Sequence, residues 1–227
     1  MTAPLYQYPA KTLLGRVVAK QRILAHVRAT AKLRERLRDD VAQITWHAKL
    51  AHNTLNLPGT DEVPELQVFV ITLKGDDLHR DVLRAIDRAI PFPILFELHG
   101  ARGIRVTAAY KRPSQADPSK WVLDDHYASS DWLPAETPRQ PLPTAIDLKQ
   151  LYQQLLRSLL PAPARQGEAL PDQLERLRAL EALKKDAANL EKRLRNEKQF
   201  NRKVEINAEL RSIRQKLADY VIADYDT

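Results

Sequence analysis

A run of 49 residues without glycine or proline, from 172 to 220, constrains the fold of this chain more than any other feature. Its apolar residues recur at alternating steps of three and four, which is the spacing of a coiled-coil seam. There are two such series, the first made of Leu183, Ala187, Leu190 and Leu194, and the second of Ile206, Leu210, Ile213, Leu217 and Tyr220. We therefore predict a helical coiled-coil tail over residues 172–222.

The two series do not share one frame. Continuing the first series forward reaches Glu197 and Asn201, and continuing the second backward reaches Lys203 and Gln199, which are all polar. Two geometries fit this break: one long helix with a register discontinuity, or two helices that fold back on each other. The absence of glycine and proline favours the continuous helix.

The stretch EKQFNRKVEINAEL (197–210) lies where the two frames fail to join, and it is strongly basic at its start. Residues 192–203 contain six Lys and Arg but Glu197 as their only acid. Cations at helical spacing can contact a phosphate backbone, and an aromatic ring among them can stack on a base. The candidate nucleic-acid or partner-binding residues are Arg195, Lys198, Phe200, Arg202 and Lys203. The alternative is an ordinary solvated helix with Glu–Lys pairs.

A second basic segment lies near the N-terminus, where residues 1–60 hold ten Lys and Arg against three acids. The apolar spacing over 12–38 predicts a helix, and its candidate binding residues are Arg16, Lys20, Arg28 and Lys32. The whole chain has a formal charge of +7. Such a charge suits a protein that contacts nucleic acid or an acidic partner, although it also serves solubility.

Residues 41–129 show the alternating or continuous apolar patterns of strands. We expect strands at 41–50, 65–75, 93–100, 104–112 and 120–129, with an amphipathic helix at 76–90. The strand at 65–75 has few polar positions, which indicates a central strand covered on both faces. The sequence therefore predicts an α+β fold over residues 1–160, with a four- to five-stranded mixed sheet and flanking helices.

Two proline-containing stretches divide the rest of the chain. Residues 131–145 are expected to form an extended linker that wraps a surface, and 146–160 a helix. Residues 161–171 are expected to form a second, exposed linker before the tail.

Several kinds of chemistry are missing from the sequence. The chain has no cysteine, which excludes disulfides, thiolate nucleophiles and Cys-ligated zinc. Its six histidines form no metal-binding motif, and its six glycines form no phosphate-binding loop. We expect no catalytic residue, no metal and no cofactor. Without a membrane-length apolar run or a secretory signal, we expect a cytoplasmic protein with no membrane partner.

One enzymatic alternative comes from the order helix–strand–strand–helix–strand, which is that of a restriction-endonuclease-like core. Such a core holds a divalent metal with acids and a lysine on neighbouring strands. Lys74 ends one predicted strand, but position 72 is Thr where an acid is required. A divergent site would have to use Glu65, Asp76 or Glu97 with Lys74.

Several phrases along the chain resemble an uncharacterised bacterial domain-of-unknown-function family of about this length. They are YPAKTLLG, ITWHAKLAHNTLNLPG, LQVFVITLKG, AIDRAIPFPILFEL, VTAAYKR and EKQFNRKVEINAEL. The resemblance implies a gene setting beside DEAD/DEAH or SNF2-type helicases and DNA methyltransferases, in restriction-like anti-phage clusters. It brings no catalytic residues with it.

Together these features predict a non-enzymatic accessory or scaffolding subunit of a bacterial defence or DNA-processing complex. Its expected partners are a helicase or DNA methyltransferase subunit and DNA, with a homodimer through the tail as a further alternative. The competing hypothesis is a divergent metal-dependent nuclease.

Overall fold

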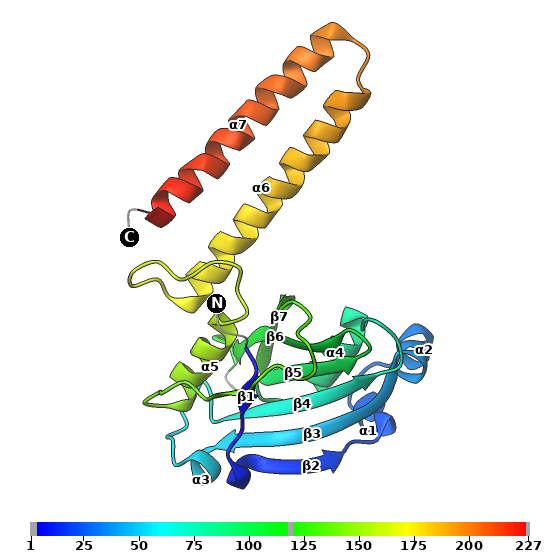
Figure 1. The fold of residues 1–227 in the computed structure, drawn as a ribbon, viewed down its shortest axis with the longest axis vertical. Helices are drawn as coiled ribbons and strands as arrows, with labels where there is room; N and C mark the ends of the chain where they lie inside the picture. The colour runs from blue at the N-terminus through cyan, green and yellow to red at the C-terminus, as the bar shows by residue number, and fades with distance from the viewer. Residues whose placement is uncertain (1–3, 118–119, 226–227) are drawn as a thin grey trace. The chain divides into compact units, whose positions relative to one another are not determined.

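The computed structural model describes residues 4–117 and 120–225, and the chain divides into two compact units at residue 160. The first unit is a mixed α+β domain and the second is a helical hairpin (Figure 1). None of the helices in the described ranges is both long and apolar enough to span a bilayer.

A six-stranded mixed sheet organises the first unit. Its strands, in spatial order, are β2 (Leu13–Val17), β3 (Val41–Ala51), β4 (Glu65–Leu73), β5 (Ile94–Gly100), β6 (Gly103–Pro113) and β7 (Trp121–Ser129). Only β4 and β5 are parallel, and α4 (Arg80–Ala89) makes the crossover between them. The α+β class and the mixed sheet were predicted, whereas the strand count of four to five was too low.

The strand missing from that count is β2, which lies inside the segment 12–38 that was predicted to be a helix. Residues 12–38 do not form one helix; they form β2, α1 (Lys20–Ala25) and α2 (Ala31–Asp39). Gly15 has a φ of +60°, which a helix interior does not accommodate, and it lies where the register of β2 against β3 shifts. Thr30 then begins α2, because its side chain accepts a hydrogen bond from the backbone N–H of Leu33.

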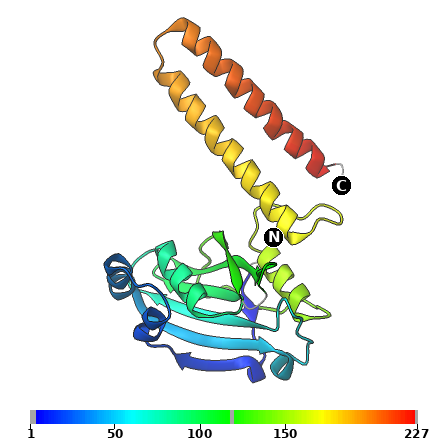
Figure 2. The ribbon, with the colours of Figure 1, turned by 180° about the vertical axis from the view of Figure 1, so that it is seen from behind.

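The strand β4 is central, as its sequence predicts. Its apolar side chains are buried on both faces of the sheet. One face of the sheet packs against α1, α2 and α4, as Figure 2 shows from behind. Ile71 and Phe96 are among the fully buried residues of this core. On the other face, α5 (Leu148–Arg157) packs through Tyr152 and Leu155 against β4 and β6.

Short elements complete the first unit. The 3-10 helix η1 (Ala10–Thr12) precedes β2, and α3 (His52–Leu55) follows β3. The proline-rich segment 131–145 contains β8 (Gln140–Pro141), which pairs in parallel with β1 (Tyr6–Gln7).

The second unit is a helical hairpin of α6 (Leu170–Asn196) and α7 (Phe200–Tyr225). Its apolar residues pack between the two helices, with Ala187 and Leu190 of α6 meeting Ile206 and Leu210 of α7. The single continuous helix that the lack of glycine and proline favoured is therefore wrong, and the folded-back alternative is observed.

The loop before α6 is held by side chains. Arg176 donates two hydrogen bonds to the carboxylate of Glu168, at 2.7 and 2.9 Å, and a third to the carbonyl of Pro163. The ion pair and the hydrogen bond from the backbone N–H of Arg165 lower the pKa of Glu168 to about 2. The segment 161–169 is thus fastened to α6 by specific contacts.

Candidate interface at the hairpin tip

The reversal of the chain at the hairpin tip is made by Glu197. The backbone N–H of this residue still bonds to the carbonyl of Arg193, but its ψ of 135° ends α6. Its side chain then accepts hydrogen bonds from the backbone N–H groups of Lys198 and Gln199, at 2.8 and 2.9 Å. A carboxylate in this position satisfies free donors and stabilises the start of α7. One acidic residue thereby makes a turn that needs no glycine or proline.

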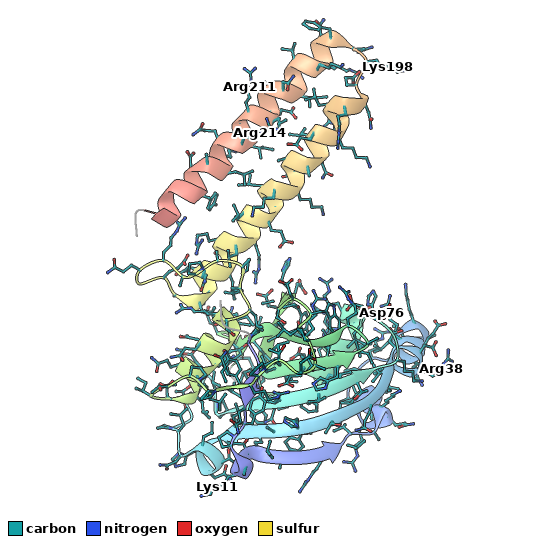
Figure 3. The ribbon with its side chains drawn as sticks, viewed as in Figure 1. Lys11, Arg38, Asp76, Lys198, Arg211 and Arg214 are labelled. Atoms are coloured by element: carbon teal, nitrogen blue, oxygen red, sulfur yellow. The ribbon has the colours of Figure 1, made fainter. Side chains whose placement is uncertain are left out.

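The reversal brings the predicted basic residues to one end of the hairpin. We define the hairpin tip as residues 192–203, which end α6, form the turn and begin α7. Lys198 lies in the turn, as Figure 3 shows. The hydrogen bonds to Lys198 and Gln199 lower the pKa of Glu197, so this acid stays ionised but is directed at the backbone. The tip therefore keeps a large excess of positive charge.

Among the hairpin side chains whose burial the structure describes, those up to residue 220, Phe200 is the most exposed large apolar one, with 77% of its surface accessible. It is the first residue of α7 and lies outside the apolar seam that joins the two helices. Arg202 and Lys203 follow it in the first turn of α7. An exposed phenyl ring among cations offers a stacking surface and a cation at the same place.

A cleft of about 430 Å³ lies beside the tip, between the end of α6 and the start of α7. Arg193 and Arg202 line it together with Glu205 and Glu209. The acids make this flank of the hairpin nearly neutral. Lys198 and Lys203 do not line this cleft, and they add positive charge to the end of the hairpin.

The N-terminal candidates lie on different elements of the first unit. Arg16 is exposed on the edge strand β2, and Lys32 is exposed on α2. The ammonium group of Lys20 is engaged, because it donates a hydrogen bond to the carbonyl of Val41. Arg28 lies in the loop between α1 and α2, where it lines a hollow against α4.

The structure separates the acids of the nuclease hypothesis. Glu65 and Lys74 lie at or beyond opposite ends of β4, and Glu65 is paired with Lys49. Glu97 is buried in the middle of β5 and bound by Arg139. Within residues 4–117 and 120–225, no group of three His, Asp or Glu is placed to hold a metal ion.

A buried polar cluster around Glu97 was missed by sequence reasoning. Arg139 donates two hydrogen bonds to the Glu97 carboxylate, at 2.9 and 2.6 Å, and His99 lies 3.3 Å away. Burial alone would raise the pKa of Glu97, but these hydrogen bonds lower it to about 2. Arg139 also donates to the carbonyl of Tyr6, so the cluster ties β1 and the segment 131–145 to the sheet. Only the unexpected acid inside the apolar strand ILFELHG could have indicated it.

A second buried pair lies beneath α4. Lys111 of β6 donates hydrogen bonds to the carbonyls of Asp87, Ile90 and Phe92, which closes the C-terminal end of α4. Burial lowers the pKa of Lys111 to about 8 and raises that of Asp87 to about 6. Tyr127 donates a hydrogen bond to the Asp87 carboxylate at 2.5 Å. These contacts hold the helix on the sheet.

The fold and the tip define a mixed α+β protein that carries a helical hairpin with a basic, aromatic end. The family model of DUF4391, a domain of unknown function, matches residues 7–217, and the chain belongs to this family. The match includes the sheet, the loop 161–169 and the hairpin tip. No curated protein and no solved structure is significantly similar to the chain.

Proposed function

We propose that this protein is a non-enzymatic accessory subunit that contacts nucleic acid through its hairpin tip. The observation that carries this proposal is the exposure of Phe200 within six Lys and Arg, which the turn at Glu197 brings to one end of the hairpin. Cations of this density attract a phosphate backbone, and the free ring can stack on an unpaired base.

The alternative of an ordinary solvated helix explains the tip less well. A solvated helix balances its cations with acids three or four residues away. Lower in the hairpin, a cation is paired across the two helices, where Arg214 of α7 donates to Glu191 of α6 at 2.9 Å. At the tip, Glu197 is directed at backbone donors, and Lys192, Lys198 and Lys203 have no acid three or four residues away.

DNA binding by charge-reversal variants tests the proposal. The tip variant is Arg195→Glu/Lys198→Glu/Arg202→Glu, and the matched control is Lys184→Glu/Lys185→Glu/Lys216→Glu, exposed on the same two helices. Fluorescence anisotropy with a labelled 20-nucleotide single strand and its duplex gives the affinities. We expect the tip variant to lose more than about tenfold in affinity and the control much less. Equal losses in both would contradict a site at the tip.

Phe200→Ala separates stacking from charge. It leaves the charge unchanged, so its loss of affinity should be larger for the single strand than for the duplex, because only unpaired bases can stack on the ring. An equal loss of affinity for the single strand and for the duplex would contradict a stacking role for Phe200.

The protein partner in this proposal is a helicase or DNA methyltransferase subunit of a bacterial defence or DNA-processing complex. The family resemblance supports this part, and in the proposal the hairpin bridges the partner to DNA. Affinity purification from native cells followed by mass spectrometry tests it. Absence of any helicase or methyltransferase among specific co-purifying proteins contradicts it.

Nuclease activity is the competing function, favoured by the order α2–β3–β4–α4–β5, in which only the four-residue helix α3 comes between β3 and β4. Incubation with plasmid, linear and single-stranded DNA in magnesium or manganese tests it directly. The separation of Glu65 from Lys74 and the pairing of Glu97 with Arg139 lead us to expect intact DNA. Cleavage that is lost in Lys74→Met would overturn that expectation.

A further inference from the structure

The first unit contains a groove between α1 and α4. Of the candidate residues predicted from the sequence, only Arg28 lines it. It consists of two hollows that meet at His26. The first has a volume of about 280 Å³, and the second about 370 Å³. Consecutive residues of α4 continue the groove from one hollow to the other, since Arg88 lines the second and Ala89 the first.

The first hollow is apolar and aromatic. Trp46 and Phe69 line it with parallel rings whose centroids are 6.4 Å apart, and Phe92 adds a third ring. The amide of Gln67 at this hollow is already used, because it accepts from the Trp46 indole at 2.7 Å and donates to Glu65 at 2.7 Å. Arg22, His26 and Glu65 also line the hollow, and Glu65 is paired with Lys49, but most of the lining residues are apolar.

The second hollow is basic. Its acid, Asp81, is paired with Arg36, and its Arg84 is paired with Asp125. The side chains of Arg28 and Arg88 are exposed and make no hydrogen bond or ion pair with the residues that the structure describes. Two guanidinium groups thus stand beside an aromatic hollow without a counter-ion from the described chain.

We infer that this groove binds an acidic peptide segment of a partner protein, with one bulky apolar side chain in the aromatic hollow and neighbouring carboxylates on Arg28 and Arg88. Charge complementarity selects the acidic residues, and planar guanidinium groups bind carboxylates through two parallel hydrogen bonds. An aromatic or aliphatic anchor beside arginines is the usual composition of a strong contact in protein interfaces.

A nucleotide fits the groove less well. Its phosphate suits the arginines, but the donors and acceptors at the edge of its base would lose water in a hollow that is lined mostly by apolar side chains. A peptide side chain such as Phe or Leu has no such groups. The peptide is therefore the occupant that both hollows favour.

Selection from an unbiased library tests the inference. Random twelve-residue peptides displayed on phage are selected on the full chain and counter-selected on Arg28→Glu/Arg88→Glu. We expect enriched peptides to contain a large apolar residue close to two or more acids. Enrichment of basic or neutral sequences, or no enrichment at all, would overturn the inference.

Binding of the best enriched peptide then locates the site. Anisotropy should show that Arg28→Glu/Arg88→Glu weakens binding by about tenfold or more, and that Ala89→Phe, which fills the aromatic hollow, does the same. The control Lys11→Glu/Lys185→Glu changes the net charge equally at exposed positions that do not line the groove, and it should leave binding intact. Circular dichroism and thermal unfolding check that each variant is folded.

The groove and the hairpin tip belong to different units. The peptide proposal and the nucleic-acid proposal can therefore be contradicted independently. The tip variant Arg195→Glu/Lys198→Glu/Arg202→Glu should bind the peptide normally. Displacement of the peptide from this tip variant by AMP or by a single-stranded oligonucleotide would instead assign the groove to nucleotides and overturn the peptide.

Discussion

Glu97 shows at the scale of one residue how a buried charge is retained in this fold. Its side chain is 1% exposed, and Arg139 and His99 hold it ionised. A buried carboxylate that loses its partner is costly, because the charge then stays in an apolar environment without compensation. The pair is therefore a sensitive point for the attachment of β1 and the segment 131–145.

The pKa of Glu97 predicts how stability depends on pH. Because the folded pKa is about 2 and the ordinary value is 4.5, Glu97 contributes stability above pH 4.5 that is lost as the pH falls toward 2. Arg139→Met should lower the free energy of unfolding by about 2 kcal/mol at pH 7. This difference from the wild type should shrink in acid, when Glu97 is protonated. Urea unfolding between pH 3 and 7 measures it, and a constant difference contradicts the account.

Gly103 is a second position at which a single substitution should destabilise the fold. It has a φ of +107° in the turn between β5 and β6, and a Cβ there would lie 2.0 Å from the carbonyl oxygen of Leu133. Ile104 and Leu133 exchange backbone hydrogen bonds at 2.8 Å, so Leu133 cannot withdraw freely. Gly103→Ala should cost roughly 2 kcal/mol or more in thermal or urea unfolding, whereas Gly75→Ala, with open space around it, should cost much less.

The hairpin shows at the scale of elements what a sequence pattern predicts and what it leaves open. The two apolar series correctly place two long helices, since their spacing depends only on neighbours along the chain. The choice between folding back and continuing depends on the polar contacts of Glu197, which the apolar pattern does not contain. Burying the seam within one chain also avoids the entropy that a second molecule loses on association.

The prediction of one helix over residues 12–38 was wrong for a related reason. Their apolar spacing fits a helix, but pairing of β2 with β3 decides the conformation of Leu13–Val17, and that partner is distant in sequence. The strands β3 to β7 were predicted because each carries a strong pattern of its own. The Glu97 cluster was missed because it joins β5 to Arg139, 42 residues later, and spacing alone gives no sign of such a pair.

A distance between two spin labels distinguishes the hairpin from a continuous helix. Because the chain has no cysteine, Glu191→Cys/Arg214→Cys places labels without further changes. These side chains are in contact in the hairpin, whereas 23 residues of unbroken helix would separate them by roughly 35 Å. Pulsed electron resonance should give a short distance, below about 20 Å. A peak near 35 Å would contradict the turn at Glu197.

At the scale of the whole molecule, the chain combines a sheet domain with a helical hairpin, and each unit carries its own candidate surface. The basic tip suits a polyanion, and the groove between α1 and α4 suits an acidic peptide. This division fits an accessory subunit that joins a protein partner to nucleic acid. Because the two surfaces lie in different units, substitutions can abolish one of them without changing the other.

A homodimer through the tail can be tested on the same scale. Its seam is already occupied within the hairpin, where Leu190 and Leu210 are buried. We therefore expect light scattering to give the same oligomeric state for the full chain and for residues 1–160. A dimer that is lost on removal of the hairpin would contradict this expectation.

The salt dependence of DNA binding tests the central claim most directly. Each cation that contacts a phosphate adds about 0.7 to 0.9 to the slope of log K against log salt concentration. If the tip binds DNA, Arg195→Gln/Lys198→Gln/Arg202→Gln should reduce the magnitude of that slope by about two to three. The control Lys184→Gln/Lys185→Gln/Lys216→Gln should leave it nearly unchanged. Equal slopes for the wild type and the tip variant would contradict a nucleic-acid interface at the hairpin tip.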